Sequence, residues 1–426
     1  MEGLAHGDRR GNSSQQIATV VIGLLKLALR NVLRHRGRTA MTLASVVFGV
    51  VALILAGGFI EDTIVETGES MIRSSSGHLQ VSRKGYWTYG AQKPEQYLIE
   101  KPDELRKTLE GAPGTDQVMF RIAFSGLLGN GKTDWSIIGE GIEPDRERRL
   151  ASYITVVAGR HLENKDEFGM MIGAGVAKAL KLKPGDPVTL LVSTTGGATN
   201  LLEFEVKGVF QTFSKDYDSR AVRIPLGAAQ ELLATPGAHT AVVLLTNTHD
   251  TDAAAAYVKS KVPANQFEMR TWVQLNEFYT QTVTLYEQQF GFLVVIILVM
   301  LLLSVSNTVN IGIFERVSEF GTMLALGNRS ARVFNLILAE SLCLGLIGAA
   351  LGALIGVGLA LAISDIGIPM PPPPNADQGY ISRILVVPEV IGLSVIVGLV
   401  AAMTASVLPA WKVSRMHIAD ALRQGV

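Results

Sequence analysis

Four long apolar segments without a charged residue constrain this chain more than any other feature. They comprise residues 39–60, 291–314, 341–364 and 390–408. Each is close to the roughly 20 residues with which a helix crosses about 30 Å of hydrocarbon. The composition agrees, since 48% of the residues are hydrophobic and only 18% are charged. The sequence therefore predicts an α-helical membrane protein with four transmembrane helices.

The distribution of charge predicts which segments face the cytoplasm. Residues 1–38, the link 315–332 and the tail from Lys412 together carry 13 basic and 5 acidic residues, whereas 61–290 carries 24 basic and 29 acidic residues. Basic loops are retained on the cytoplasmic side of a membrane. We therefore expect both termini and the link in the cytoplasm, and the segment 61–290 outside it.

These two patterns together predict the order of segments along the chain. The expected segments are a cytoplasmic N-terminus with an amphipathic membrane-surface helix (1–38), transmembrane helix 1 (39–60), a large extracytoplasmic α/β domain with helical stalks (61–290), transmembrane helix 2 (291–314), a cytoplasmic link (315–332), transmembrane helix 3 (333–364), an extracytoplasmic proline-rich loop (365–389), transmembrane helix 4 (390–408) and a cytoplasmic tail (409–426). Residues 24–33 combine an apolar helical face with a basic one, which predicts the surface helix. A charged flank without such a helix is the alternative.

The external segment has the mixed patterns of an α/β domain. Residues 200–210 alternate apolar and charged side chains, as in a strand with one buried face. A short helix is expected from Val176 to a stop near Pro184, and Gly196 and Gly197 are expected at a hairpin tip. The ends of the domain, 61–76 and 270–290, are expected to continue the adjacent spans as helices.

Residues 126–133, GLLGNGKT, match the phosphate-binding pattern G-x-x-x-x-G-K-[ST]. In a nucleotide-binding loop this turn must open a helix, whose first N–H groups hold the phosphates. The residues that follow include a short β-like run at Ile137 and Ile138, and Gly139 and Gly141 disfavour a helix. We therefore expect a β-hairpin at this motif and no nucleotide site.

Other signs of catalysis or metal binding are weak. The seven histidines lack metal-ligand spacing, the carboxylates of the external segment are scattered as on a solvated surface, and Cys343 is the only cysteine. A formal net charge of zero gives no indication of a nucleic-acid partner. We expect no catalytic residue, no metal site and no cofactor bound by this chain.

Residues 315–327 carry a recognisable pattern, E-R-x-x-E-[IF]-G-x-x-x-A-L-G, which Glu340 and a glycine-rich span follow. Together with LALRNVLRHRGRTAMTLASVVFGV near the start, MIGAGVAKALKLKPGDPVTLL in the external segment and LPAWKVSRMHIADALR near the end, this pattern resembles the permease subunits of ABC transporters of the FtsX/MacB/Lol (mechanotransmission, type VII) family. The resemblance covers nearly the whole chain in the family's order.

The resemblance implies a membrane subunit without ATPase activity, in which 315–332 is a coupling helix. Residues implied to contact the ATP-binding subunit are Glu315, Arg316, Glu319, Phe320, Gly321, Leu326 and Gly327. The implied partners are two copies of an ATP-binding subunit that carries ATP and Mg, a second copy of the permease or a homologous permease, membrane lipid, and a periplasmic adaptor, carrier or outer-membrane protein. A bacterial inner membrane is the implied location. Phe320, Met323, Leu324 and Leu326 are expected to form an apolar face on this helix.

Two groups of residues inside the predicted spans have their own expected roles. Gly345, Gly348, Gly352 and Gly356 recur every three or four residues and are expected to pack on another span or on a second copy. Glu340 is a carboxylate in the third span, which needs a partner. The expected partners are Asn307 and Asn310 of the second span, or Arg332; a proton-relay role for Glu340 is the alternative to a packing contact.

The function expected from the resemblance is coupling of ATP hydrolysis, by a separate subunit, to movement of an extracytoplasmic domain. The cargo would be a lipoprotein, a lipid-like molecule or another amphiphile. The alternative is an FtsX-like signalling subunit that activates a cell-wall hydrolase without transport. The 230-residue size of the external segment favours a domain that handles cargo.

Overall fold

The computed structural model describes residues 36–90, 92–212, 214–371 and 379–416. The chain divides into two compact units. The first comprises residues up to 63, 284–368 and those from 381 onward, and the second comprises 64–283 and 369–380. The surface helix expected at 24–33 lies outside the described residues.

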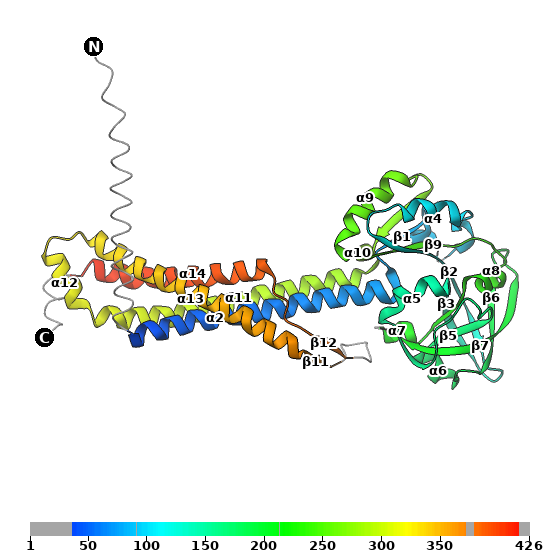
Figure 1. Cartoon of the computed structure of the whole chain (residues 1–426), viewed down its shortest axis with the longest axis horizontal. Coiled ribbons are helices and arrows are strands. Elements are labelled where there is room, and N and C mark those ends of the chain that lie inside the picture. Colours follow the sequence, from blue (N-terminus) through cyan, green and yellow to red (C-terminus); the bar gives the residue numbers. More distant parts are fainter. Residues whose placement is uncertain (1–35, 91, 213, 372–378, 417–426) are drawn as a thin grey trace, which may run out of the picture. The chain divides into compact units, whose positions relative to one another are not determined.

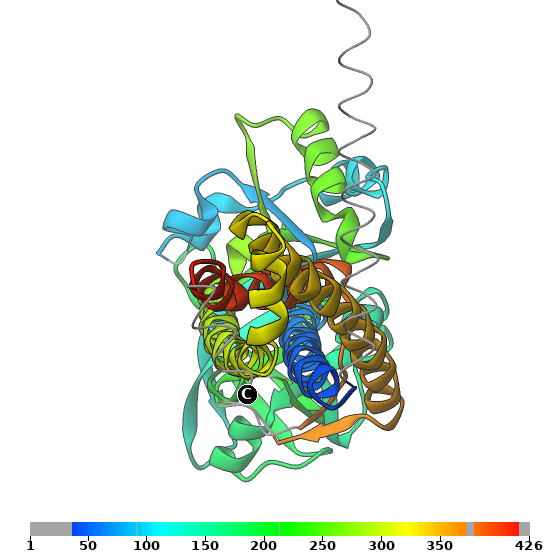
Figure 2. The same cartoon turned by 90° about the vertical axis from the view of Figure 1, so that its left-hand side faces the viewer.

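The first unit is built from four long apolar helices. Their bounds are α2 Arg36–Met71, α11 Glu277–Phe314, α13 Ser330–Ile366 and α14 Pro388–Ser414. Within the described part of the chain, four helices are long and apolar enough to cross a membrane. Figure 1 shows them in sequence colours, and Figure 2 shows them nearly end-on. The protein is therefore an α-helical membrane protein with four transmembrane helices and an α/β domain between the first and the second.

Small and β-branched side chains fill the interior of the helix bundle. The central cluster consists of Val46, Val50, Ile54, Val305, Ala349, Ala402 and Ala405, from all four helices. Lipid chains are as apolar as these side chains, so close packing supplies the attraction between the helices. Small side chains at the contacts allow that close approach.

The connection between α13 and α14 is attached to α2. It contains two short paired strands, β11 Ile368–Met370 and β12 Tyr380–Ser382. The Asp62 carboxylate accepts hydrogen bonds from the Ser382 hydroxyl (2.7 Å) and the Arg383 N–H (2.8 Å). Of the expected proline-rich connector, Pro369 lies in β11, and residues 372–374 lie outside the described part.

The second unit is a mixed α/β domain. Its strands are β1 Leu79–Arg83, β2 Thr115–Gly129, β3 Asp134–Ile142, β4 Thr155–Gly159, β5 Gly169–Gly173, β6 Pro187–Ser193, β7 Thr199–Gln211, β8 Ala221–Pro225, β9 Thr240–Leu245 and β10 Phe267–Thr271. Its α-helices are α3 Tyr86–Tyr89, α4 Pro102–Glu110, α5 Pro144–Leu150, α6 Ala174–Leu180, α7 Lys215–Asp218, α8 Leu226–Leu233, α9 Thr251–Lys261 and α10 Trp272–Leu275.

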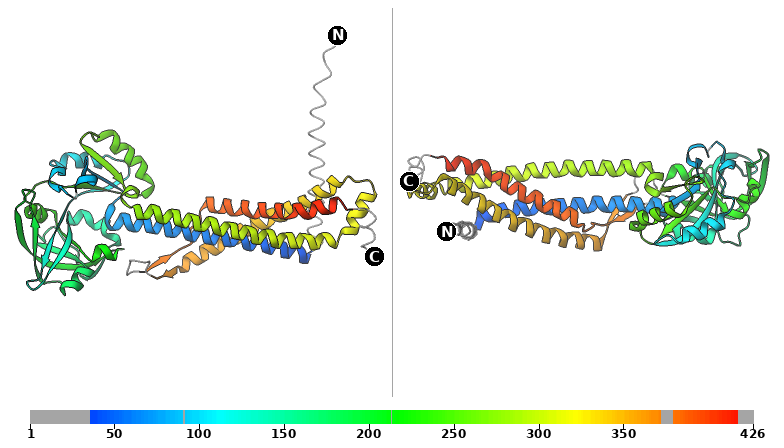
Figure 3. Two further views of the ribbon diagram at one scale, coloured as in Figure 1. Left: turned by 180° about the vertical axis from the view of Figure 1, so that it is seen from behind. Right: turned by 90° about the horizontal axis from the view of Figure 1, so that it is seen from above.

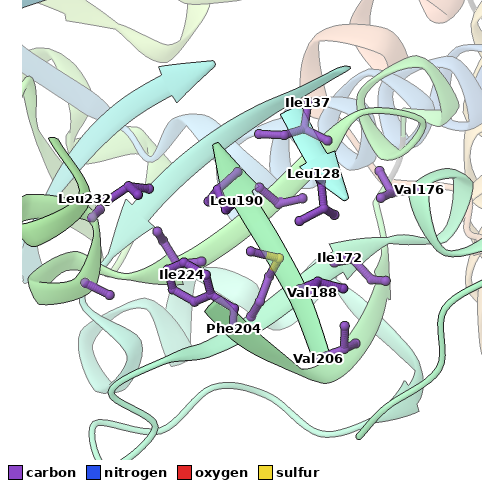
Figure 4. Close-up of a cluster of buried hydrophobic side chains, with 14 of the residues drawn as sticks. Leu128, Ile137, Ile172, Val176, Val188, Leu190, Phe204, Val206, Ile224 and Leu232 are labelled. Carbon is purple, nitrogen blue, oxygen red and sulfur yellow. The ribbon is translucent and has the colours of Figure 1, made fainter. Parts of the chain in front are cut away.

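One lobe of this domain is a closed ring of six strands. Going round the ring, β2 pairs with β3, β3 with β8, β8 with β5, β5 with β7, β7 with β6, and β6 with β2. The inward side chains form one apolar core, to which α6 and α8 contribute (Figure 4). Ring closure leaves no free edge among these six strands, which protects the lobe from pairing with other chains.

The other lobe shares strand β2 with the ring. The first half of β2 pairs with β9, β9 pairs with β1, and β1 pairs with β10. Helices α4 and α9 cover this sheet and contribute Leu105, Leu109, Ala254 and Val258 to its core. Figure 3 shows both lobes in two further views. Because β2 belongs to both lobes, it joins them into one continuous sheet.

Local patterns of the sequence agree with β7 and with the turn that precedes it. In β7, Phe204 and Val206 are buried while Glu203 and Glu205 are exposed, as the alternation predicted. Gly197 lies in the turn between β6 and β7 with φ of +80°. The predicted helix near Val176 is shorter than expected, because Lys181 has φ of +56°, and α6 therefore ends at Leu180.

The prediction that 270–290 continue the second span as a helix is confirmed for 277–290, which belong to α11, and wrong for the residues before Glu277. Strand β10 runs to Thr271, whose side chain caps the short helix α10 together with Gln274. Asn276 interrupts the helix, and α11 begins at Glu277. The helical spacing of apolar residues could not reveal β10, because that strand depends on pairing with β1, far away in the sequence.

Candidate functional site

The segment that joins α11 to α13 contains a short helix, α12 (Val317–Ala325). At its end, the Gly327 N–H donates to the Leu324 carbonyl (3.0 Å) and the Asn328 N–H to the Met323 carbonyl (3.2 Å). This is the Schellman arrangement, in which glycine adopts a positive φ without strain, and Gly327 has φ of +86°. The segment expected to be a coupling helix is therefore helical and ends sharply.

One face of α12 is attached to the ends of the long helices. Phe320 is only 2% exposed. It packs in a cluster with Ile313, Val333, Ile337, Ala410 and Val413, from α11, α13 and α14, which Met323 and Leu324 also contact. Movement of α12 therefore requires movement of these helix ends, or loss of the cluster.

The residue that directly follows α12 exposes an apolar side chain. Leu326 is 80% exposed. The expectation of an outward apolar face with Phe320, Met323 and Leu324 is corrected here, because those three side chains pack wholly or partly against the bundle. Gly321 is also buried, so a bulky replacement there would act on this chain's own packing.

The ionic contacts of Arg316 join α12 to α13. Its guanidinium lies 3.0 Å from the Glu340 carboxylate and 2.9 Å from that of Glu319. The Arg316 side chain is 8% exposed and that of Glu340 is 15% exposed. The same guanidinium lies over the Phe320 ring, 5.1 Å from its centroid. A buried ion pair of this kind holds its two elements in a defined register.

The described ion pair of Glu340 is with a residue that the sequence did not suggest. Arg332 instead donates to the Asn328 side chain (2.9 Å), Asn307 is exposed, and Asn310 is partly exposed. Glu340 pairs with Arg316, 24 residues earlier in the chain. Periodicity could not indicate this pair, because it depends on how the chain folds back after α11.

The ion pair lies beside a small cavity of about 40 Å³ with polar and apolar lining. Thr42 of α2, Thr308 of α11 and Ser341 of α13 line it together with Arg316 and Glu340. A cavity of this size holds about one water molecule. Polar side chains from three long helices therefore lie close to Arg316, at the start of α12.

The glycines of α13 pack within the chain. A Cβ atom at Gly348, Gly352 or Gly356 would lie within 3.1 Å of Val46, Val50 or Ile54 of α2. At Gly345 it would lie 3.0 Å from Ala402 of α14. Of the two alternatives expected for this glycine face, the structure shows packing on other spans of the same chain.

Substitution of Gly352 by leucine is expected to lower the stability of the protein by about 1–3 kcal/mol, the usual cost of overpacking. A Cβ atom there would be 2.8 Å from the Val50 Cβ and 3.2 Å from the backbone of Val47. Gly358→Leu is the matched control, because no atom lies within 4 Å of its Cβ position. The check is the melting temperature in detergent micelles; equal melting of the two variants would contradict this packing.

The phosphate-binding pattern at 126–133 forms a β-hairpin, as expected. Strand β2 ends at Gly129 and β3 begins at Asp134. The backbone N–H groups of Lys132 and Thr133 donate to the Asn130 side chain (2.9 Å each). No helix follows, so the turn lacks the geometry that holds nucleotide phosphates.

Two buried histidines of the α/β domain serve its backbone. His78 Nδ1 accepts from the Leu245 N–H (3.0 Å), and His239 Nδ1 accepts from the Ala123 N–H (3.0 Å). Burial lowers the pKa of each to about 4, so both rings are neutral near pH 7. In the described part of the chain, no group of three or more His, Cys, Asp or Glu residues is arranged to hold a metal ion.

Comparison with protein families accounts for both units. Residues 39–261 match the MacB-like periplasmic core domain, and residues 291–418 match the FtsX-like permease C-terminal region. The chain belongs to the MacB-like and FtsX-like permease family. It is therefore a permease of the ABC type, with the four-helix arrangement and the inserted domain described above.

Several relatives align with most of the permease. It is 22% identical to an uncharacterized ABC transporter permease of Methanocaldococcus jannaschii, over 80% of this chain and 85% of that protein. It is 24% identical to the macrolide export ATP-binding/permease protein MacB of Hyphomonas neptunium, over 90% of this chain and 59% of that longer protein. It is 22% identical to the lipoprotein-releasing system transmembrane protein LolC of Haemophilus influenzae, over 91% and 94%.

Solved structures of related domains are also similar. The periplasmic region of MacB from Actinobacillus actinomycetemcomitans matches with 15% identity and a TM-score of 0.36, over 49% of this chain and 94% of that one. The extracellular domain of the transporter YknZ from Gram-positive bacteria matches with 16% identity and a TM-score of 0.34, over 46% and 99%.

Proposed function

We propose that this permease couples ATP hydrolysis by a separate ATP-binding subunit to movement of its α/β domain outside the cytoplasm. In this proposal α12 is the element that the ATP-binding subunit pushes. ATP and Mg would be bound by the partner, in two copies, and this chain would contribute no catalytic residue. The distribution of basic residues supports a cytoplasmic position for α12 and for both termini. A bacterial inner membrane is the proposed location.

The observation that carries this proposal is the two-sided environment of α12. Phe320 and Arg316 attach one side of the helix to the bundle, through a buried apolar cluster and a buried ion pair. At its end, Leu326 presents a large apolar side chain to the surroundings. A helix with one anchored side can pass a force from another protein to the membrane helices, and the exposed Leu326 side chain is available for contact with that protein.

The interior of the bundle supports handling of cargo outside the membrane. Ser394 and Ser406 are buried, but their hydroxyls donate to carbonyls of their own helix, at Val390 and Met403. The cavity beside Arg316 has a volume of about 40 Å³. Among the described residues, these groups do not form a continuous polar route, so movement of the α/β domain is the better supported means of acting on cargo.

The names of the relatives support an amphiphilic cargo. One relative is described as a macrolide exporter and another as part of a lipoprotein-releasing system. We propose a lipoprotein, a lipid-like molecule or another amphiphile for this permease. A second permease, identical or homologous, would complete the assembly, and an adaptor, carrier or outer-membrane protein would receive the cargo.

A site-specific crosslink tests the proposed role of α12. Cys343 is the only cysteine, so Cys343→Ser gives a background for a single cysteine at position 326. A photoreactive maleimide at this position is expected to capture an ATP-binding subunit in native membranes. Mass spectrometry of the adduct would identify its nucleotide-binding motifs.

The matched control carries the same probe at position 358, on an open face of α13 within the expected span. Capture of the ATP-binding subunit from position 326 and not from 358 would support the proposal. Failure at 326 in a membrane where the complex assembles would contradict it. An ATP-dependent change in the α/β domain without release or transport of an amphiphile would favour the signalling alternative.

A further inference from the structure

The end of helix α2 inside the α/β unit has an unusual set of attachments. After Met71 the helix continues as one π-helical segment, η1 (Ile72–Ser76), and the chain then enters β1 through Gly77. The last carbonyls of a helix have no N–H donor within the helix, and they form the negative end of its dipole. Here the Ser75 carbonyl accepts from Arg121 Nη1 (2.5 Å), and the Ser74 carbonyl accepts from Arg223 Nη2 (3.1 Å).

Both arginines come from the ring of strands. Arg121 lies on β2 and Arg223 on β8, with β3 between these strands. Glu140 of β3 is directly opposite Arg223 in the pairing register, and directly opposite Ala123 on the other side. Residues two apart on a strand face the same side, so Arg121 and Glu140 project from the same face of the sheet.

The buried charges of this cluster balance one another. Arg121 is 4% and Arg223 3% exposed. Glu147 of α5 accepts from Arg121 at 2.5 and 2.8 Å. Glu140 lies 3.7 Å from Arg121 and 3.4 Å from Arg223. The expectation that the carboxylates of this domain are merely scattered on its surface is therefore corrected for Glu140 and Glu147, which form a neutral group with the two arginines.

A third side chain completes the cluster. The Tyr217 hydroxyl donates to Glu140 (3.1 Å). Burial raises the pKa of Tyr217, and the charge of Glu140 raises it further, so the phenol stays protonated. Burial alone would raise the pKa of Glu140, but Arg121 and Arg223 lower it overall. Both guanidiniums therefore keep a negative partner while they bind the end of α2.

Contacts on other sides of the same helix end complete the attachment. Ile72 is fully buried among Met119, Leu150, Val242, Leu244 and Trp272. Thr248 donates to Glu69, and His78 Nε2 lies 3.1 Å from the Thr248 hydroxyl. A Cβ atom on Gly77 would lie 2.4 Å from Val242. The last turns of α2 are thus bonded to β2, β8 and the segment after β9.

We propose that Arg121 and Arg223 are positioning residues that fix the last turn of α2 to the sheet, so that a shift or rotation of α2 moves the α/β domain instead of being absorbed at the junction. This inference rests on the proposed coupling function. The N–H groups of both arginines donate to main-chain carbonyls at the end of the helix. The connection therefore depends on the geometry of the helix backbone and does not require a particular side chain of α2.

Spin-label distances test the rigidity of this joint without nucleotide or partner. In the Cys343→Ser background, labels would be placed at Val65 of α2 and at the exposed Glu203 of β7. Two charge-balanced double variants remove one attachment each: Arg121→Met with Glu147→Met, and Arg223→Met with Glu140→Met. Replacing a buried ion pair by apolar side chains of similar volume commonly preserves folding.

The distance distribution is expected to broaden in both double variants. The matched control is Arg106→Met with Glu143→Met, a partly buried pair at 2.7 Å in the same domain whose hydrogen bonds go to Val118 and Phe120 rather than to α2. Its distribution should stay as narrow as that of the parent. A distance distribution of unchanged width in a folded double variant would overturn the inference. Because there are two such variants, the test remains possible if one of them does not fold.

A second readout separates this inference from the proposed function. In the complex with the ATP-binding subunit, labels at Leu361 and Glu203 would report an ATP-dependent change in distance. The change is expected to be lost in both double variants and kept in the control, while ATP hydrolysis continues in all of them. If the parent shows no such change, the proposed coupling fails, and the widths measured without nucleotide still decide whether the joint is rigid.

Discussion

Replacement of Arg316 by methionine is expected to cause the largest loss of stability among the substitutions considered. The Glu340 side chain is 15% exposed, and its carboxylate would lose the guanidinium that lies 3.0 Å away in the parent. Removal of one partner from a buried ion pair typically costs about 3–5 kcal/mol, because the remaining charge stays desolvated. The melting temperature of the purified permease and the ATP hydrolysis rate of the complex should both fall.

Two further variants identify the cause. Combining Arg316→Met with Glu340→Gln removes the isolated charge, so much of the lost stability should return, while the contact between α12 and α13 stays broken. Arg332→Met is the control for loss of a basic residue at an exposed site. The Arg332 side chain donates a hydrogen bond to the side chain of Asn328. Equal effects of Arg316→Met and Arg332→Met would show that the ion pair has no special role.

Replacement of Leu326 by aspartate is expected to have the largest effect on partner binding. Burial of a leucine side chain contributes about 1.5–3 kcal/mol, so its loss should weaken binding of the ATP-binding subunit by about 10- to 100-fold. The permease itself should melt at an unchanged temperature, because Leu326 is 80% exposed. Binding of the purified ATP-binding subunit to the permease in detergent provides the measurement.

Leu326→Met keeps an apolar side chain and should retain nearly normal affinity. Ser330→Asp places the same new charge on an exposed residue at the start of α13, and separates the effect of lost apolar contact from that of added charge. If Leu326→Asp binds as tightly as the parent, α12 does not dock through its exposed end, and the proposed coupling site must lie elsewhere.

These two variants act on different steps of the proposed mechanism. Leu326 concerns contact with the partner, whereas Arg316 concerns transfer of movement from α12 to α13. An altered Leu326 should therefore lower affinity at low partner concentration and be rescued at high concentration. An altered Arg316 should not be rescued in this way, because the defect lies within the permease.

Local patterns of the sequence were sufficient for the elements that depend on local physics. The four spans follow from uninterrupted hydropathy, since a segment of about 20 apolar residues has few stable alternatives to a membrane helix. The hairpin at 126–133 follows from the absence of a helix after its glycines.

The tertiary structure alone decided which charged residues meet. Glu340 could be paired with Asn307, Asn310 or Arg332 from the sequence, and its partner proved to be Arg316, because α12 folds back on the helix ends. In the α/β domain, β2, β3, β8 and α5 bring Arg121, Glu140, Arg223 and Glu147 together from positions up to 102 residues apart. Such pairs leave no periodic signal, because their proximity depends on strand order and on chain reversal, whereas hydropathy and turn preference act between neighbours in the sequence.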